Sequence, residues 1–443
     1  MLDTTAAHLL ARTARAQRDG RAPSLVAGVV RDGTLAWSAG RGDVPEPHTN
    51  VQYRIGSITK TVCAVAVLRL RDEGRLDLDD DLDTHLPGTP LGGRTVGQLL
   101  SHMAGAGSES PGQWWERTPG SSLATLGLTE ADRVHAAGRR FHYSNLGFGL
   151  LGELVAGLRG RPWADVVRDE VLLPLGMTRT STRPTPPAAQ GFAVHPWADL
   201  LLPEPEHDAV SMAAAGQLWA TLTDLGRLAA FLLGDGADVL PTATLEEMLE
   251  PAGGETEDDG SWMGYGLGVM VLSSQGRTLV GHAGSMPGFL AGVFVDRPEQ
   301  VGAVSLSNAT SGGDGALHGD LLRIVREHEP LVGEPWRAAT TYDAAAMALV
   351  GPWYWGPSAC TMSLHGDGLL HLSWIGRGSR ASRFAAHGDG TWRGLDGYYA
   401  GETLRPASDG SSFDLATFVF TRSPYAPAEV VPGGVEPGGW RPA

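Results

Sequence analysis

Cysteine and positive charge are scarce in this sequence. Its 443 residues include only 2 cysteines, Cys63 and Cys360. Their separation in the chain excludes a disulfide framework and favours a reducing compartment. Asp and Glu outnumber Lys and Arg by 50 to 34, and the formal net charge is −16. Because bulk charge of this sign disfavours nucleic acid and anionic membranes, we expect neither as a partner.

Long apolar runs are missing as well. No stretch approaches the roughly 20 apolar residues that a membrane-spanning helix needs. The first 25 residues, MLDTTAAHLLARTARAQRDGRAPSL, contain no apolar core of a signal peptide. Their spacing predicts an amphipathic helix that ends at Gly20. We therefore expect the protein to stay in the cytoplasm.

Several chemical motifs are absent or incomplete. H-E-x-x-H and C-x-x-C do not occur, so we expect no catalytic metal, and nothing else calls for a cofactor. The absence of G-x-S-x-G argues against an α/β-hydrolase. Residues 147–152 match G-x-G-x-x-G, but no βαβ unit follows, which favours close helix packing over a dinucleotide site. The acidic run LDLDDDLDTHLPG lacks the glycine and the distal glutamate of a calcium loop, so we interpret it as solvated.

The order of patterns along the chain predicts two domains. A hairpin at Asp32-Gly33 is followed by a buried helix over 57–74, helical patterns up to about residue 235, two long strand regions before residue 308 and a last helix. This order predicts an α+β domain over 1–334, with an antiparallel sheet flanked by helices and an inserted helical region. Short alternating strands separated by Asp-Gly turns predict a small all-β, barrel-like domain over 335–443, which ends in an irregular tail.

The segment RIGSITKTVCAVAVLRLRDEG places Ser57 three residues before a lone lysine, Lys60. At this spacing both side chains lie on one face of a helix. A helix N-terminus favours a developing alkoxide, and an apolar setting lowers the pKa of an amine, so the pair fits an activated serine nucleophile. An N-capping serine and a lysine that extends to solvent would also fit these four residues.

Two further segments add polar side chains. Tyr143 and Asn145 come directly before a helical pattern, where a phenol can relay protons and an amide can hold a substrate amide. His282 ends a strand and is followed by Gly284, and glycine there allows close approach of a substrate backbone. The histidine itself can relay a proton or polarise a carbonyl.

With these residues the sequence resembles the serine β-lactamase and penicillin-binding-protein superfamily. The flanking text VGQLLSHMAGAG and AAAGQLWATLTDLGRLAAFLL is similar to the class C β-lactamase-like branch, which includes esterases, D-aminopeptidases and thioesterases. The resemblance spans about residues 1–330. It rests on three motifs in order: Ser57-x-x-Lys60, Tyr143-x-Asn145 and His282-x-Gly284.

The resemblance implies a role for each matching residue. Ser57 would be the acylated nucleophile and Lys60 its proton partner. Tyr143 would be the general base for acylation and for activating the incoming nucleophile, and Asn145 would position the substrate amide. The backbone N–H groups of Ser57 and Ser285 would form the oxyanion hole.

One departure from the family pattern bears on the substrate. The third motif of β-lactamases usually begins with lysine, which attracts a carboxylate, whereas this chain has His282. This difference, the missing export signal and the β domain are similar to penicillin-binding-protein-type thioesterases, which release nonribosomal peptides from carriers. We therefore expect a small-molecule or peptidyl acyl substrate, presented by a carrier protein. A stand-alone esterase or D-stereospecific amidohydrolase is the alternative, ahead of a β-lactamase or an acylation sensor.

Four further features invite interpretation. His102 fits a structural hydrogen-bonding role, and Cys63 fits a buried, inert thiol. The charged run Glu204–Asp208 fits either an exposed loop or a site for a substrate amine. Trp440 and Arg441 lie in the tail, for which disorder is the default expectation.

Overall fold

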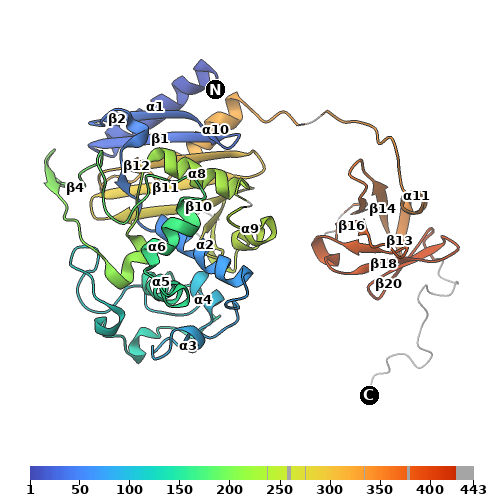
Figure 1. Ribbon diagram of the computed structural model, residues 1–443. Helices are drawn as coiled ribbons and strands as arrows, with labels where there is room; N and C mark the ends of the chain where they lie inside the picture. Colours follow the sequence, from blue (N-terminus) through green and yellow to red (C-terminus); the bar gives the residue numbers. More distant parts are fainter. Residues whose placement is uncertain (237, 257–260, 275, 334, 377–379, 426–443) are drawn as a thin grey trace. The chain divides into compact units, whose positions relative to one another are not determined.

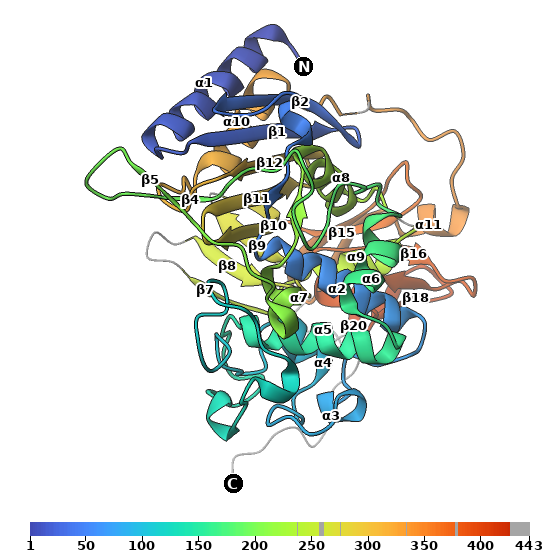
Figure 2. The same cartoon turned by 60° about the vertical axis from the view of Figure 1, so that its left-hand side comes forward.

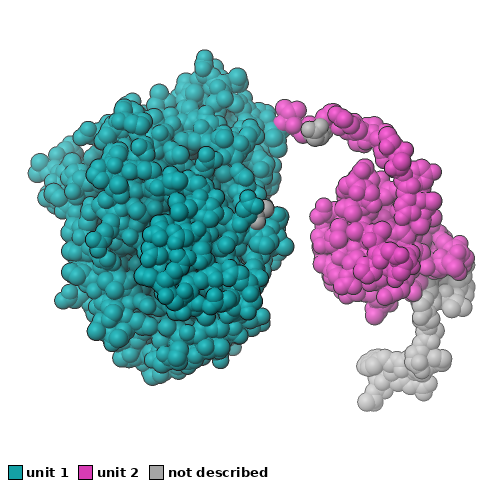
Figure 3. Space-filling view, in the orientation of Figure 1, with its two compact units in different colours: residues 1–331 teal, residues 332–443 magenta. Residues whose placement is uncertain are grey.

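The protein is described by a computed structural model. It describes residues 1–443 with the exception of 237, 257–260, 275, 334, 377–379 and 426–443. The chain forms two compact units, Met1–Leu331 and Val332–Ala443 (Figure 3). The predicted boundary lay after residue 334. The assignment of catalysis to the first part remains a prediction.

Unit 1 is built on an eight-stranded sheet in which every neighbouring pair is antiparallel. Its order is β2-β1-β12-β11-β10-β9-β8-β7. The strands are β1 (Ser24–Arg31), β2 (Thr34–Gly42), β7 (Gly253–Thr256), β8 (Trp262–Tyr265), β9 (Met270–Ser274), β10 (Arg277–Met286), β11 (Phe289–Asp296) and β12 (Val301–Ser307). The predicted hairpin joins β1 to β2, and both loop residues, Asp32 and Gly33, have positive φ (51° and 68°), as tight two-residue turns require.

Helices cover both faces of this sheet. α1 (Asp3–Asp19) and α10 (Leu317–His328) pack on one face, where Ala27 and Val29 of β1 share their cluster. α2 (Ile58–Asp72) and α8 (Leu222–Leu233) pack on the other face with Val26 and Val30. Because strand side chains alternate between faces, β1 contributes to both cores and reads as a continuous apolar run. The α+β prediction is confirmed.

The helical region contains α3 (Leu82–His85), α4 (Val96–Leu100), α5 (Asn145–Arg159), α6 (Trp163–Val167), α7 (Ala213–Gly216) and α9 (Thr242–Leu249). Of these, α3, α4 and α5 lie at the opposite end of unit 1 from α1 and α10 (Figures 1 and 2). A π-helical turn, Arg168–Leu172, continues α6. Short strands form two further pairs: β3 (Tyr53–Arg54) with β6 (Trp219–Ala220), and β4 (Phe192–Val194) with β5 (Leu201–Pro203).

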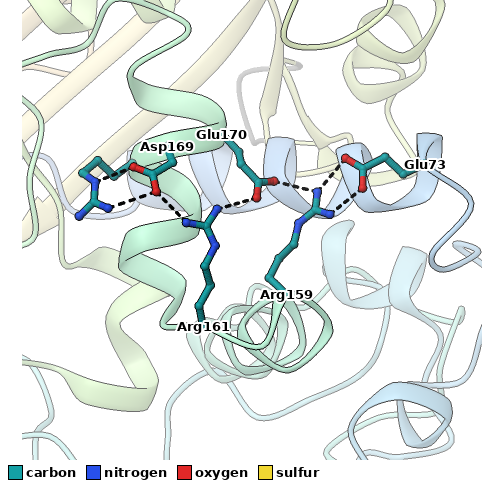
Figure 4. A network of polar contacts seen from close by, with 6 residues as sticks. Glu73, Arg159, Arg161, Asp169 and Glu170 are labelled. Carbon is teal, nitrogen blue, oxygen red and sulfur yellow. Dashed lines mark hydrogen bonds and ion pairs between the residues drawn. The ribbon is translucent and has the colours of Figure 1, made fainter.

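A chain of ion pairs ties the ends of these helices together (Figure 4). Arg159, at the end of α5, contacts Glu73 after α2 at 2.6 Å and Glu170 of the π-helical turn at 2.7 Å. Arg161 contacts Glu170 at 2.8 Å and Asp169 at 2.6 Å. Isolated surface pairs stabilise little, but shared partners in a network fix the relative placement of α2, α5 and α6.

The helical block is shorter than predicted. Residues 101–144 contain two 3₁₀ turns, Leu123–Thr125 and Glu130–Asp132, and otherwise irregular backbone. Runs such as AGAGSESPG supply no helical period, and Gly105 (φ 64°) and Gly112 (φ 98°) take conformations that helices exclude.

Unit 2 contains a closed barrel of eight strands. They are β13 (Gly351–Trp355), β14 (Ser358–Leu364), β15 (Leu370–Trp374), β16 (Ser382–Ala386), β17 (Trp392–Gly394), β18 (Thr403–Pro406), β19 (Ser412–Leu415) and β20 (Phe418–Thr421), preceded by α11 (Ala344–Leu349). Trp353, Phe384 and Phe413 fill its own core. The barrel prediction is confirmed. Within the described residues, no helix combines the length and the apolar character needed to cross a membrane.

Candidate active site

Ser57 lies where strand β10 meets the start of α2. It is the residue directly before α2, and Gly56 before it has φ 50°. A Cβ atom on Gly56 would lie 2.6 Å from the backbone nitrogen of Ser285, so only glycine allows this approach. A Cβ on Gly284 would overlap the Ile55 carbonyl oxygen and lie 3.3 Å from the Ser57 nitrogen. The two glycines therefore hold the Ser57 and Ser285 amides close together.

Lys60 makes three hydrogen bonds from one turn inside α2. As an ammonium, its Nζ donates to Ser57 Oγ at 2.9 Å, to Asn145 Oδ1 at 2.6 Å and to the Ala215 carbonyl at 2.7 Å. The neutral amine has two N–H donors, which the Asn145 and Ala215 oxygens take, so its lone pair accepts from the Ser57 hydroxyl. The side chain is completely buried, and burial lowers the pKa of Lys60 to about 7, against the opposing effect of Glu109. Near neutral pH the amine is therefore uncharged in a large share of molecules.

Tyr143 enters the site from the loop before α5. Ser144 caps that helix, because its Oγ accepts from the Gly147 amide at 2.9 Å. The Ser144 amide donates to His102 Nδ1 at 3.0 Å, so His102 fixes the backbone beside Tyr143. Burial raises the pKa of Tyr143 above its ordinary value, although a hydrogen bond with Ser57 works in the opposite direction. The phenol is un-ionised at neutral pH.

His282 is buried and uncharged. Burial lowers its pKa to about 3. Nδ1 lies 2.5 Å from the Ala283 carbonyl, which can only accept, so Nδ1 carries the proton. Nε2 then accepts from the hydroxyl of Tyr265 at 2.8 Å. The ring centres of His282 and Tyr143 are 6.4 Å apart, so the imidazole lies near the Tyr143 ring, and because it is uncharged it adds no positive charge to the site.

The edge of β10 is open beside the nucleophile. β9 pairs with residues 277–281 of β10, whereas β11 pairs with residues 280–286. Within the described part of the chain, the edge that carries Ala283 and Ser285 thus continues past the end of β9. Ser57, Tyr143 and residues 282–285 line one part of a cavity of about 1070 Å³, which also extends along α10 and the segment 311–316.

The structure brings all seven sequence-predicted residues into one region. Three residues in contact with them were not predicted: Tyr265, which holds His282; Glu109, which accepts from Asn145 Nδ2 at 2.8 Å; and the Ala215 carbonyl. None of the three belongs to one of the sequence motifs. Glu109, for example, lies in an irregular loop rich in Gly and Ser. The sequence does not indicate which backbone carbonyl accepts a hydrogen bond from Lys60.

The other sequence interpretations have different outcomes. Glu204 is buried and paired with Arg117 at 2.5 Å, so it is not available to a substrate amine. Cys63 is buried, and burial raises the pKa of its thiol to about 12, as an inert thiol requires. Trp440 and Arg441 lie outside the described residues. Among the described residues, no group of three or more His, Cys, Asp and Glu side chains is placed to hold a metal ion.

Two protein-family models match this chain. The family model described as Beta-lactamase matches residues 7–327, and one described as Domain of unknown function (DUF7586) matches residues 342–422. Beta-lactamase-like protein 2 of Dictyostelium discoideum is 25% identical over 313 residues, which cover 65% of this chain. The match spans 56% of that relative's length.

Solved structures show the same fold. An octameric penicillin-binding protein homologue from Pyrococcus abyssi has a TM-score of 0.65 at 20% identity and covers 95% of this chain and all of its own. A D-stereospecific amidohydrolase from Streptomyces sp. has a TM-score of 0.58 at 26% identity and covers 73% of this chain and 98% of its own. The chain therefore belongs to the β-lactamase family, within the β-lactamase and penicillin-binding-protein superfamily of serine hydrolases.

Proposed function

We propose that the protein transfers acyl groups through an ester on Ser57, with neutral Lys60 as the group that first takes the hydroxyl proton. The observation that carries this proposal is the 2.9 Å contact between Lys60 Nζ and Ser57 Oγ, on an amine whose pKa lies at about 7. This differs from the role that the resemblance implied for Tyr143. An un-ionised phenol is a poor proton acceptor, whereas a desolvated neutral amine is a good one.

The acylation step follows from these positions. Ser57 Oγ attacks the substrate carbonyl while its proton passes to Lys60, and the amides of Ser57 and Ser285 hold the developing oxyanion. Collapse of the tetrahedral intermediate breaks the bond to the leaving group. Tyr143, hydrogen-bonded to Ser57, relays the proton from Lys60 to that group. Water or an amine then attacks the ester by the reverse proton path.

For the substrate, we propose a peptidyl thioester presented by a carrier protein, released by hydrolysis or cyclisation. Two features support this choice. The neutral His282 removes the cation that would attract a carboxylate beside the scissile bond. The barrel of unit 2 is the second feature, because a β-lactamase-like unit followed by a small β domain is similar to the penicillin-binding-protein-type thioesterases.

A D-stereospecific amidohydrolase is the second candidate. It is favoured by the likeness to the Streptomyces amidohydrolase, which at 26% identity covers 98% of that chain. The same acyl-enzyme serves both candidates. They differ in the leaving group, a thiol in one and an amine in the other.

Intact-protein mass spectrometry tests the proposal directly. The protein would be mixed with a peptidyl N-acetylcysteamine thioester that ends in a D-residue and, separately, with a D-amino acid amide. We expect the mass of one acyl group on Ser57, and none on Ser57→Ala. Cyclic or free peptide from the thioester supports the first candidate, and turnover of the amide alone supports the second. The absence of any Ser57 adduct would contradict both.

A further inference from the structure

Unit 2 has an arginine, Arg380, whose guanidinium lies among aromatic rings. Its Cζ atom is 4.2 Å from the centre of the Tyr398 ring, 5.2 Å from that of Trp355 and 5.5 Å from that of Phe418. Contacts of this kind hold a guanidinium in place and use none of its N–H groups. Nη1 of Arg380 is buried, and no described residue accepts a hydrogen bond from it.

The closed barrel brings these side chains to one of its ends. Because the strands are antiparallel neighbours, β13 and β15 end where β16 and β20 begin. Trp355 is the last residue of β13, Phe418 is the first residue of β20, and Arg380 lies between β15 and β16. Tyr398 belongs to the 3₁₀ turn Gly397–Tyr399 between β17 and β18. The barrel fold, and not proximity in sequence, thus places the rings around Arg380.

Further buried donors in this cluster have no partner. Tyr399 is completely buried, and its hydroxyl makes no hydrogen bond to a described residue. Burial raises the pKa of Tyr399, and the positive charge of Arg380 works in the opposite direction, so the two groups are close. The indole N–H of Trp374, at the end of β15, is also buried and unpartnered within the described residues, and its ring meets Trp355 edge-on at 6.0 Å. The cluster therefore contains several donors and lacks an acceptor.

Arg422 of the same barrel shows how a structural arginine is satisfied. It also lies over a ring, with its Cζ atom 3.8 Å from the centre of Trp353, but it donates to the carbonyls of Val350 at 3.1 Å and Ala348 at 2.5 Å. A buried N–H without an acceptor is costly, and folded proteins contain few of them. The unpartnered donors around Arg380 therefore indicate an acceptor that a ligand supplies.

We propose that this end of the barrel binds a carboxylate attached to an apolar group, with Arg380 as its ion-pair partner and Tyr399 as a second donor. One arginine balances one negative charge, so a carboxylate fits this apolar site better than a phosphate dianion. The Tyr398 side chain is 56% exposed, so its ring is accessible to the apolar part of the ligand. The inference concerns unit 2 alone and does not depend on acyl transfer at Ser57.

Four small ligands test the chemistry of the site: phenylacetate, phenylacetamide, acetate and phenyl phosphate. Each would be titrated into the full-length protein labelled with ¹⁵N at tryptophan, and the dissociation constant would be read from the shifts of the indole N–H resonances. We expect phenylacetate to bind at least about 10-fold more tightly than phenylacetamide, which lacks the charge, and than acetate, which lacks the ring. Phenyl phosphate should bind more weakly than phenylacetate.

Three variants test the residues. Arg380→Gln removes the charge and should weaken phenylacetate binding by about 10- to 100-fold, the effect of losing a charged hydrogen bond. The matched control Arg405→Gln removes an exposed arginine of β18 and should bind like the wild type. Tyr399→Phe should also weaken binding. Without ligand it should not lower the melting temperature of the barrel, because the hydroxyl has no partner to lose.

Several results would overturn the proposal. They are equal binding of phenylacetate and phenylacetamide, tighter binding of phenyl phosphate, and unchanged binding in Arg380→Gln. Absence of binding by all four ligands, or a lower melting temperature in Tyr399→Phe, would mean that the donors bind only structural water. Acetylation of Ser57 by p-nitrophenyl acetate reports the proposed function separately, so failure of one does not imply failure of the other.

Discussion

Lys60 is the only lysine in the chain, which makes its ionisation directly observable. In protein labelled with ¹³C at the lysine ε carbon, a single resonance should titrate with a midpoint of about 7. The ammonium dominates below this pH and the neutral amine above it, so kcat/KM for p-nitrophenyl acetate should rise through the same range. Ser57→Ala should keep the titration and lose the activity. A midpoint near 10 would contradict the role of Lys60 as proton acceptor.

Tyr265 holds His282, the first residue of the third motif, through a hydrogen bond to its Nε2. Tyr265→Phe removes the donor to His282 Nε2 and leaves a buried acceptor unpaired. We expect a loss of about 1–3 kcal/mol in the free energy of unfolding, measured with urea. The matched control Tyr398→Phe removes a hydroxyl from an exposed side chain and should be nearly neutral. Equal effects of the two changes would show that this hydrogen bond carries no stability.

At the scale of residues, the sequence predicted those parts of the site that lie in motifs. Ser57 and Lys60 have a fixed spacing on one helix, so their contact follows from helix geometry alone. Glu109 reaches Asn145 from a loop that precedes it by 36 residues, and no periodic pattern marks its position. The pairing of Tyr265 with His282 depends on the side-by-side register of β8, β9 and β10, which local sequence does not encode.

At the scale of elements, α2 carries a destabilising charge. The pKa of lysine is roughly 10.4 in an unfolded chain and about 7 for folded Lys60, so between these values the unfolded state binds more protons. Wild-type stability should therefore rise with pH relative to Lys60→Met, by up to about 1.4 kcal/mol per pH unit above pH 7. Below pH 7 both states are charged and the difference should level off. Urea unfolding of both proteins from pH 6 to 9 measures this, and a constant difference above pH 7 would contradict it.

The accuracy of the element predictions follows the strength of the local signals. The β1–β2 hairpin and the C-terminal end of α2 were predicted because Asp32-Gly33 and Gly74 take left-handed conformations that few other residues accept. Helical patterns were expected to recur up to about residue 235, but the segment 101–144 is irregular apart from two 3₁₀ turns. Its backbone bonds go to distant partners, as from Gly120 to Asp208, and such pairings cannot be inferred from neighbouring residues.

At the scale of the whole molecule, each unit has its own apolar core. The barrel core contains Phe413, which is completely buried, stacks on Phe420 at 4.7 Å and meets Trp353 edge-on at 4.7 Å. The cores of unit 1 contain none of these residues. Separate cores predict that the two units unfold as separate transitions.

Phe413→Ala tests this independence. Removal of a buried ring should lower the free energy of unfolding of unit 2 by about 3–5 kcal/mol and leave the transition of unit 1 in place. Differential scanning calorimetry resolves the two transitions, and acetylation of Ser57 by p-nitrophenyl acetate reports the state of unit 1. We expect full acetylation at temperatures where the mutated barrel has already melted. Loss of acetylation in step with barrel melting would instead mean that the active site depends on unit 2 for its structure.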